Sequence, residues 1–155
     1  MKTSLCCDVL KVLEGKTLAT AESLTGGGIG AAITSVSGAS AVYKGGIVSY
    51  TNEVKHRLLG VPELVLEQYG AVSEPTARAM VQGVRELLGA DVAVSVTGLA
   101  GPGGDEFENP LGTVFIGYED ARHTAVRHCL FSGNREEIRE QTILAALKLI
   151  LEQQA

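Results

Sequence analysis

Apolar residues follow two different periods along the first third of the chain, and each period predicts an element. They recur at helical spacing over residues 4–14, which predicts an amphipathic helix ended by Gly15. The continuous run of small and apolar residues over 17–22 predicts a short buried strand. A segment rich in glycine and alanine, about 26–36, then predicts a helix that approaches a neighbour closely, because its side chains are small.

The middle of the chain predicts one strand followed by three helices. Residues 42–50 favour a strand, and Gly45 and Gly46 indicate a bulge or kink inside it. The helices are expected at 52–59, 62–69 and 74–88. Ser73 is a typical cap for the last of them, with Pro75 in its first turn.

The last third predicts a strand, a glycine-rich loop, a hairpin and a long helix. These elements are expected at 91–97, at 98–110, at 112–118 paired with 123–131, and from 134 onwards. Asn134 and Glu137 have the spacing of a reciprocal capping box. The order of elements predicts an α/β fold, a three-layer α/β/α sandwich around a mixed sheet, in a single domain over residues 1–155.

Composition and charge narrow the classes of partner. Eighteen acidic and 13 basic residues give a formal charge of −5, the basic residues are scattered, and there is no tryptophan. Nucleic-acid-binding proteins normally carry a basic stripe or stacking aromatics, so we expect no nucleic acid. No apolar stretch approaches the roughly 20 residues that span a bilayer, so we expect no membrane and a cytoplasmic location.

The three cysteines, Cys6, Cys7 and Cys129, do not form a recognisable framework. Their number is odd, two are adjacent, and no C-x-x-C or zinc-type spacing with histidine occurs. We therefore expect buried or half-buried thiols in a reducing compartment rather than disulfides or metal ligands.

Glycine makes up 19 of the 155 residues, about 12% against an average of about 7%. One cluster, Gly26-Gly27-Gly28-Ile29-Gly30-Ala31, fits the dinucleotide-binding pattern G-x-G-x-x-A between a strand and a helix. The acid that would hold a ribose at the end of the next strand is missing from Ile47–Tyr50. Two readings remain: the amides near Gly26 and Gly27 bind a phosphate or carboxylate, or the glycines serve close packing.

Ser23 stands at a strand-to-helix turn, where a hydroxyl projects at the edge of the sheet that active sites prefer. Such a serine is more often a helix cap than a nucleophile, and a nucleophile needs a base. None of the three histidines, His56, His123 and His128, lies beside a glycine loop. Lys55, just past a strand end, is the better base if burial lowers its pKa, although most lysines are solvated surface charges.

A second glycine cluster, Gly98 to Gly104, follows Thr97 at another strand end. Clustered glycine amides there can bind an anion or an oxyanion. The acidic residues that follow, Asp105, Glu106 and Glu108, can in principle bind a metal, but a solvated acidic loop is the favoured interpretation.

Several segments together resemble those of a known family. Residues Ala21 to Gly27 resemble its A-E-S-C-T-G-G motif, with Leu24 in place of the common cysteine. Four further blocks match in order, at Ser40–Lys55, Gly70–Glu74, Thr97–Gly104 and Asn134–Arg139. The chain is thereby identified as resembling the CinA C-terminal domain, the nicotinamide-mononucleotide deamidase of bacterial pyridine-nucleotide salvage.

The resemblance implies an amidohydrolase that converts nicotinamide mononucleotide and water into nicotinate mononucleotide and ammonia. It also implies an α/β/α domain that forms at least a homodimer. The length of the chain indicates a stand-alone deamidase, without the larger N-terminal domain that some members carry. No metal or other cofactor is expected, because the nucleophile is a side chain.

The residues that match the family's site positions receive roles by this resemblance. Ser23 attacks the carboxamide carbon, Lys55 accepts its proton and Tyr50 aids the relay. Thr97 offers a hydroxyl to the substrate or to Lys55, and Arg135 offers a charge to the phosphate. The remaining expected substrate contacts are Thr25, Gly26, Gly27, Gly98 and Gly101, without a decision on which glycine loop meets the phosphate and which the oxyanion.

Two alternatives stay open at this point. The same glycine loops fit a non-catalytic nucleotide-binding or regulatory module. They also fit an NAD(P)-binding oxidoreductase domain, which the missing ribose acid disfavours.

Overall fold

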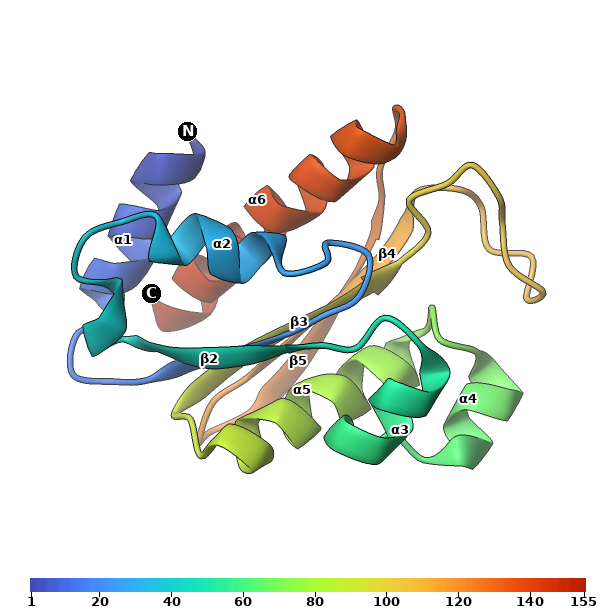
Figure 1. Ribbon diagram of the computed structural model, residues 1–155, viewed down its shortest axis with the longest axis horizontal. Coiled ribbons are helices and arrows are strands. Elements are labelled where there is room, and N and C mark those ends of the chain that lie inside the picture. Colours follow the sequence, from blue (N-terminus) through green and yellow to red (C-terminus); the bar gives the residue numbers. More distant parts are fainter.

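The computed structural model describes residues 1–155 and contains one five-stranded mixed sheet (Figure 1). The strands are β1 (Leu18–Glu22), β2 (Tyr43–Val48), β3 (Val92–Gly98), β4 (Thr113–Glu119) and β5 (Thr124–Leu130). They lie in the order β2-β1-β3-β4-β5. The first three are parallel, and β4 and β5 follow as an antiparallel hairpin. Each predicted strand is present, with ends that differ by one or two residues.

Six α-helices cover the two faces of this sheet. They are α1 (Lys2–Val12), α2 (Gly28–Thr34), α3 (Asn52–Leu59), α4 (Glu63–Tyr69), α5 (Glu74–Leu88) and α6 (Arg135–Gln154), with a short 3₁₀ helix at Ala39–Ala41. Helices α1, α2 and α6 share one apolar cluster with the sheet. Helices α3, α4 and α5 pack on the other face around a second, smaller cluster. The predicted three-layer α/β/α sandwich is confirmed.

Local sequence signals set several element ends. Asn134 and Glu137 form the predicted reciprocal capping box of α6, and the Ser73 hydroxyl accepts the Thr76 amide at the start of α5. The predicted irregularity in β2 is a register shift, in which Leu18 pairs with Tyr43 but Ala19 already pairs with Gly45.

Two glycines allow close approaches that a side chain would block. A Cβ on Gly46 would lie 2.2 Å from the Thr20 hydroxyl of β1, so β2 could not pair there unchanged. A Cβ on Gly83 of α5 would lie 1.8 Å from the Leu59 carbonyl oxygen at the end of α3. The second contact matters for function, because α3 carries Lys55. The close packing of α3 against α5 fixes the position of the Lys55 backbone.

The parallel strands end together at one edge of the sheet. Glu22, the last residue of β1, pairs with Val48 on one side and Val96 on the other. The residues that follow these three are Ser23, Ser49 and Thr97. They consequently meet at the carboxyl edge, which is the edge where open α/β sheets place their ligands.

The cysteines are all free thiols: Cys6 is buried, Cys129 is half-buried and Cys7 is exposed. The expectation of buried or half-buried thiols is therefore wrong for Cys7, which lies on the solvent side of α1. None of the helices combines the length and the apolar composition that crossing a bilayer requires.

Candidate active site

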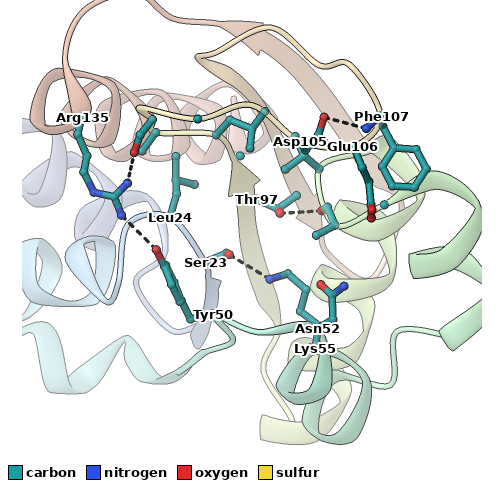
Figure 2. Close-up of a pocket in the computed structure, with 18 residues that line it drawn as sticks. Ser23, Leu24, Tyr50, Asn52, Lys55, Thr97, Asp105, Glu106, Phe107 and Arg135 are labelled. Atoms are coloured by element: carbon teal, nitrogen blue, oxygen red, sulfur yellow. Dashed lines mark hydrogen bonds between the residues drawn. The ribbon is translucent and has the colours of Figure 1, made fainter.

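Ser23 and Lys55 meet beneath a cavity at the carboxyl edge of the sheet (Figure 2). The Lys55 ammonium nitrogen lies 3.0 Å from the Ser23 hydroxyl oxygen and 2.7 Å from the carbonyl oxygen of Ser49, to which it donates. Lys55 is 1% exposed and Ser23 is 7% exposed. A serine and a lysine 32 positions apart in sequence are thus in direct hydrogen-bond contact.

Burial changes the acidity of Lys55. Removing the ammonium from water lowers its pKa from 10.5 to about 8. None of the ion pairs in the molecule involves Lys55, so no carboxylate restores the charged form. A substantial fraction of the neutral amine, which can accept a proton, is therefore present near neutral pH.

The cavity above this pair has a volume of about 460 Å³, within the range typical of small-molecule sites. Seven of the ten residues expected from the sequence line it, namely Ser23, Tyr50, Lys55, Thr97, Gly98, Gly101 and Arg135. No histidine is among the lining residues. His56 contacts Val61 and Glu63, and His128 stacks on Phe115, so neither is placed to serve Ser23.

Arg135 and Tyr50 form one wall of the cavity. The Arg135 guanidinium donates to the Tyr50 hydroxyl at 3.1 Å and to the carbonyl oxygen of Gly101. In Figure 2 the Tyr50 phenol points to Arg135 rather than to the Ser23–Lys55 pair. Tyr50 thus borders the site beside Arg135. It makes no hydrogen bond to Ser23 or Lys55, although the expected relay role requires one.

Thr97 lies at the floor of the cavity and is 1% exposed. Its hydroxyl donates to the carbonyl oxygen of Ala71 at 2.8 Å, not to Lys55. That bond ties β3 to the segment between α4 and α5, which lines the cavity through Gly70, Ala71 and Val72. Only the lone pairs of the Thr97 hydroxyl are left for a substrate.

The structure does not bring Thr25, Gly26 and Gly27 into the cavity lining. The carboxylate of Glu22, 1% exposed, occupies the start of α2 instead. It accepts hydrogen bonds from the Thr25 hydroxyl at 2.6 Å and from the amides of Ile29 at 2.8 Å and Gly30 at 3.0 Å. The Glu22 side chain therefore fills the helix N-terminus, where one of the two readings of the sequence expected a substrate phosphate or carboxylate.

The loop between β3 and β4 closes the far side of the cavity and was expected only as a glycine loop with a solvated acidic end. Asp105 organises it by accepting the amides of Phe107 and Asn109. The Asn109 side chain reaches across to the carbonyl oxygen of Val72. Asp105, Glu106 and Phe107 thus line the cavity, as does Asn52 of α3. No group of three or more histidine, cysteine or acidic side chains is placed to hold a metal ion.

A family model decides the relationship of the chain. The model described as the CinA C-terminal domain matches residues 4–154. The chain belongs to the CinA C-terminal domain family.

Individual relatives agree with this membership. A CinA-like protein from Sulfurihydrogenibium is 49% identical over 135 residues, which is 87% of this chain and 34% of the relative. Another, from Geobacter sulfurreducens, is 48% identical over 134 residues, covering 86% of this chain and 32% of the relative. The chain thus spans about a third of the length of these curated CinA relatives.

Solved CinA structures match the fold along its whole length. A crystal structure of a CinA superfamily protein from Klebsiella pneumoniae has a TM-score of 0.97 at 32% identity, covering 99% of this chain and 98% of that one. The competence/damage inducible protein from Agrobacterium tumefaciens gives a TM-score of 0.94 at 36% identity, covering 97% and 94%.

Proposed function

We propose that this CinA-family chain is an amidohydrolase that converts nicotinamide mononucleotide and water into nicotinate mononucleotide and ammonia. The observation that carries the proposal is the contact between Ser23 and Lys55, 3.0 Å long and almost completely buried. Burial lowers the pKa of Lys55 to about 8, so the lysine can act as a base without a histidine.

The reaction divides into two steps at this pair. Neutral Lys55 takes the proton of the Ser23 hydroxyl while the oxygen attacks the carboxamide carbon. The C–N bond then breaks, and ammonia leaves with the proton that Lys55 returns to it. In the second step Lys55 activates a water, which attacks the acyl carbon and releases the carboxylate product and the free serine.

The end of the cavity at Arg135 suits the phosphate of a nucleotide. Arg135 provides a guanidinium beside Gly101, and guanidinium groups bind phosphate well. We place the 5′-phosphate at this end. The carboxamide then lies over Ser23, with the ribose between the two.

A non-catalytic nucleotide-binding module is the second candidate. It explains the cavity and Arg135, but it gives no reason to bury an unpaired lysine against a serine at a free-energy cost. An NAD(P)-binding oxidoreductase is less well supported. Its phosphate would use the α2 amides that Glu22 already occupies.

Incubation of the purified protein with nicotinamide mononucleotide, without added metal, tests the proposal through the release of ammonia. We expect turnover, and we expect Ser23→Ala to reduce it by at least about 10⁴-fold while the melting temperature changes little. Ser37→Ala, on the exposed surface of the other helical layer, is the matched control and should keep full activity. Binding without ammonia release would favour the module, and retained activity in Ser23→Ala would exclude Ser23 as nucleophile.

A further inference from the structure

In the turn that carries Ser23, some backbone groups are hydrogen-bonded within the protein and others are not. The carbonyl oxygen of Ser23 accepts the amide of Gly26 at 3.1 Å, and that of Thr25 accepts the amide of Gly28 at 3.0 Å. The amides of Leu24, Thr25 and Gly27 have no acceptor within the protein. Of these three residues only Leu24 lines the cavity, next to Ser23.

The orientation of that free amide follows from the bond on the other side of its peptide group. In a trans peptide the C=O and N–H point in opposite directions. Because the Ser23 carbonyl is held by Gly26, the Leu24 N–H is directed away from the turn interior. The amide that directly follows a serine nucleophile is also the one that contributes to the oxyanion hole of unrelated α/β hydrolases.

Two charged side chains, the half-buried Arg139 and the buried Glu22, hold this turn from opposite directions. Arg139 of α6 donates from Nε to the Leu24 carbonyl at 2.9 Å and from Nη2 to the Thr25 carbonyl at 3.1 Å. Glu22 holds the other end of the turn through the Thr25 hydroxyl and the first amides of α2. The planar guanidinium fork and the two-oxygen carboxylate each make more than one bond, so together they fix the turn rigidly.

We propose that the Leu24 amide is the oxyanion donor for the reaction at Ser23, and that Arg139 and Glu22 are positioning residues that aim it. The inference rests on the proposed amidohydrolase function. It assigns the oxyanion to the turn after β1 and leaves the phosphate to the Arg135 end of the cavity, because Glu22 occupies the α2 amides.

Arg135 and Arg139 offer an internal comparison, since they lie one helical turn apart on α6. Arg135 lines the cavity, whereas Arg139 binds only backbone carbonyls of the turn. A ligand for the phosphate acts mainly on substrate binding, while a residue that aims an oxyanion donor acts mainly on the transition state. Substitution of Arg135 should therefore change mainly KM, and substitution of Arg139 should change mainly kcat.

The experiment measures kcat and KM for nicotinamide mononucleotide in Arg139→Ala, Arg139→Lys and Arg135→Ala. In Arg139→Ala we expect kcat to fall about 10- to 100-fold with KM within about twofold of wild type. Arg139→Lys should recover part of kcat, because one ammonium can still reach a carbonyl. Arg135→Ala should raise KM. Arg127→Ala, which breaks an ion pair with Glu152 between β5 and α6, is the control and should change neither constant.

A second readout does not depend on the nucleotide. Ser23 displaces fluoride from an alkyl fluorophosphonate, and the phosphoryl oxygen of that probe needs the same donor. We expect the labelling rate of Ser23 to fall in Arg139→Ala by a factor similar to kcat. If the wild type labels but releases no ammonia, the proposed function fails, and the labelling rates alone decide the inference.

Three results would overturn the positioning role. One is a raised KM with unchanged kcat in Arg139→Ala, which would make Arg139 a phosphate ligand. Another is no change in kcat or labelling. The third is an equal loss in Arg127→Ala, which would make the effect one of general stability. If Arg139→Ala does not fold, Arg139→Lys and Glu22→Gln are compared with wild type by the same two readouts.

Discussion

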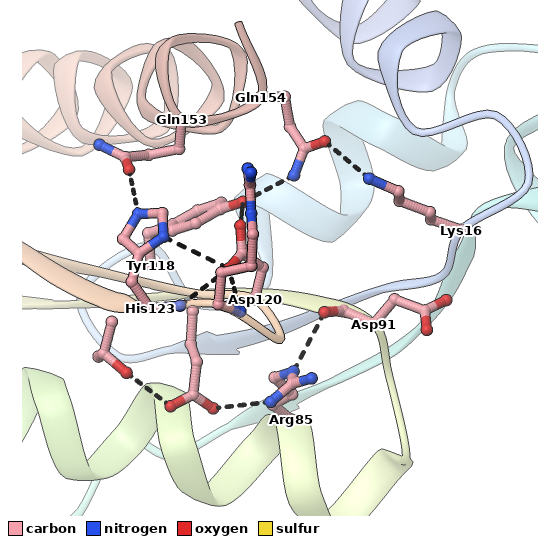
Figure 3. Close-up of polar contacts among 11 residues, drawn as sticks. Lys16, Arg85, Asp91, Tyr118, Asp120, His123, Gln153 and Gln154 are labelled. Carbon is pink, nitrogen blue, oxygen red and sulfur yellow. Dashed lines mark hydrogen bonds and ion pairs between the residues drawn. The ribbon is translucent and has the colours of Figure 1, made fainter.

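Two polar clusters lie at opposite ends of the sheet, and they treat buried charge differently. One is the Ser23–Lys55 cavity at the carboxyl edge (Figure 2). The other, the hairpin cluster, surrounds the turn between β4 and β5 and the end of α6 (Figure 3). It consists of Tyr118, Asp120, His123, Gln153 and Gln154.

In the hairpin cluster the buried charge, the Asp120 carboxylate, accepts hydrogen bonds at both of its oxygens. The Tyr118 hydroxyl donates to Asp120 at 2.7 Å and accepts from Gln154 at 2.7 Å. Burial raises the pKa of Asp120. Hydrogen bonds from Tyr118 and from the amides of Arg122 and His123 together lower it by more than burial raises it, so the net shift of the pKa is downward. The charged form of Asp120 is thus the stable one.

Lys55 shows the opposite arrangement. It is as deeply buried as Tyr118, yet burial lowers its pKa to about 8 and no countercharge opposes this. A buried charge without a partner destabilises the fold, and such groups gather at functional sites. The buried charge of the hairpin cluster is stabilised by its hydrogen bonds and supports the structure, whereas Lys55 has hydrogen bonds but no countercharge and is available for chemistry.

The largest expected effect tests the cavity side of this contrast. Lys55→Met should lower ammonia release by at least about 10³-fold, because Ser23 loses its base. At pH 7 the same variant should be more stable to unfolding than wild type, by up to about 2–4 kcal/mol, because an unpaired buried charge is removed. Urea unfolding measures this, with Lys148→Met on the exposed side of α6 as control.

The difference in the free energy of unfolding between Lys55→Met and wild type depends on pH, because the pKa of Lys55 is 10.5 in the unfolded chain and about 8 in the folded protein. Between pH 8 and 10.5 the unfolded lysine binds a proton and the folded one does not. The free energy of unfolding of the wild type therefore rises with pH in this window, and the advantage of Lys55→Met shrinks. An advantage that grows with pH would contradict the account.

A smaller effect, of the opposite kind, is expected in the hairpin cluster. Asp120→Asn should lower the free energy of unfolding by about 1–3 kcal/mol at pH 7, since it removes charge-assisted hydrogen bonds from a buried site. Because the folded pKa of Asp120 is lowered, its stabilisation is present at neutral pH and is lost as pH falls through that pKa. The free energy of unfolding of the variant should accordingly fall less steeply than that of the wild type as the pH is lowered. Its kcat should stay within about twofold of wild type.

The smallest effect belongs to the rim of the same cluster. His123 lies 3.4 Å from Asp120 and has a side chain that is 41% exposed. Exposed pairs contribute little, so His123→Ala should cost less than about 1 kcal/mol in thermal or urea unfolding. A loss of activity in this variant would mean that the two clusters are coupled.

Much of the fold was predictable because its signals are local. The predicted bounds of the helices at 52–59 and about 74–88 agree with the structure, in which Thr51 and Ser73 cap their starts and Gly60 and Gly89 follow their ends. The strand order brings Ser23 and Thr97 to one edge, which the α/β pattern already indicated. The position of Lys55 just past a strand end made it the candidate base, and the CinA motifs assign it to the same site.

The parts that the sequence did not reveal depend on contacts between distant segments. The Thr97 hydroxyl is taken by Ala71, 26 positions away, and the Tyr50 hydroxyl by Arg135, 85 positions away. No periodicity or propensity encodes such choices between hydrogen-bond partners. The role of Glu22 could have been predicted from the local sequence. An acidic residue at the end of a buried strand and just before a glycine turn indicates that its carboxylate accepts the amides that follow.

The pH profile of kcat/KM for nicotinamide mononucleotide tests the central claim most directly, because it reports the ionisation of the free enzyme. Between pH 7 and 9.5 the substrate phosphate, whose second pKa is about 6, is almost fully charged, which leaves Lys55 as the titrating group of the Ser23–Lys55 pair. We predict that kcat/KM rises about tenfold per pH unit and levels off above about pH 8. A flat profile, or one that falls over this range, would contradict a neutral Lys55 as the base for Ser23.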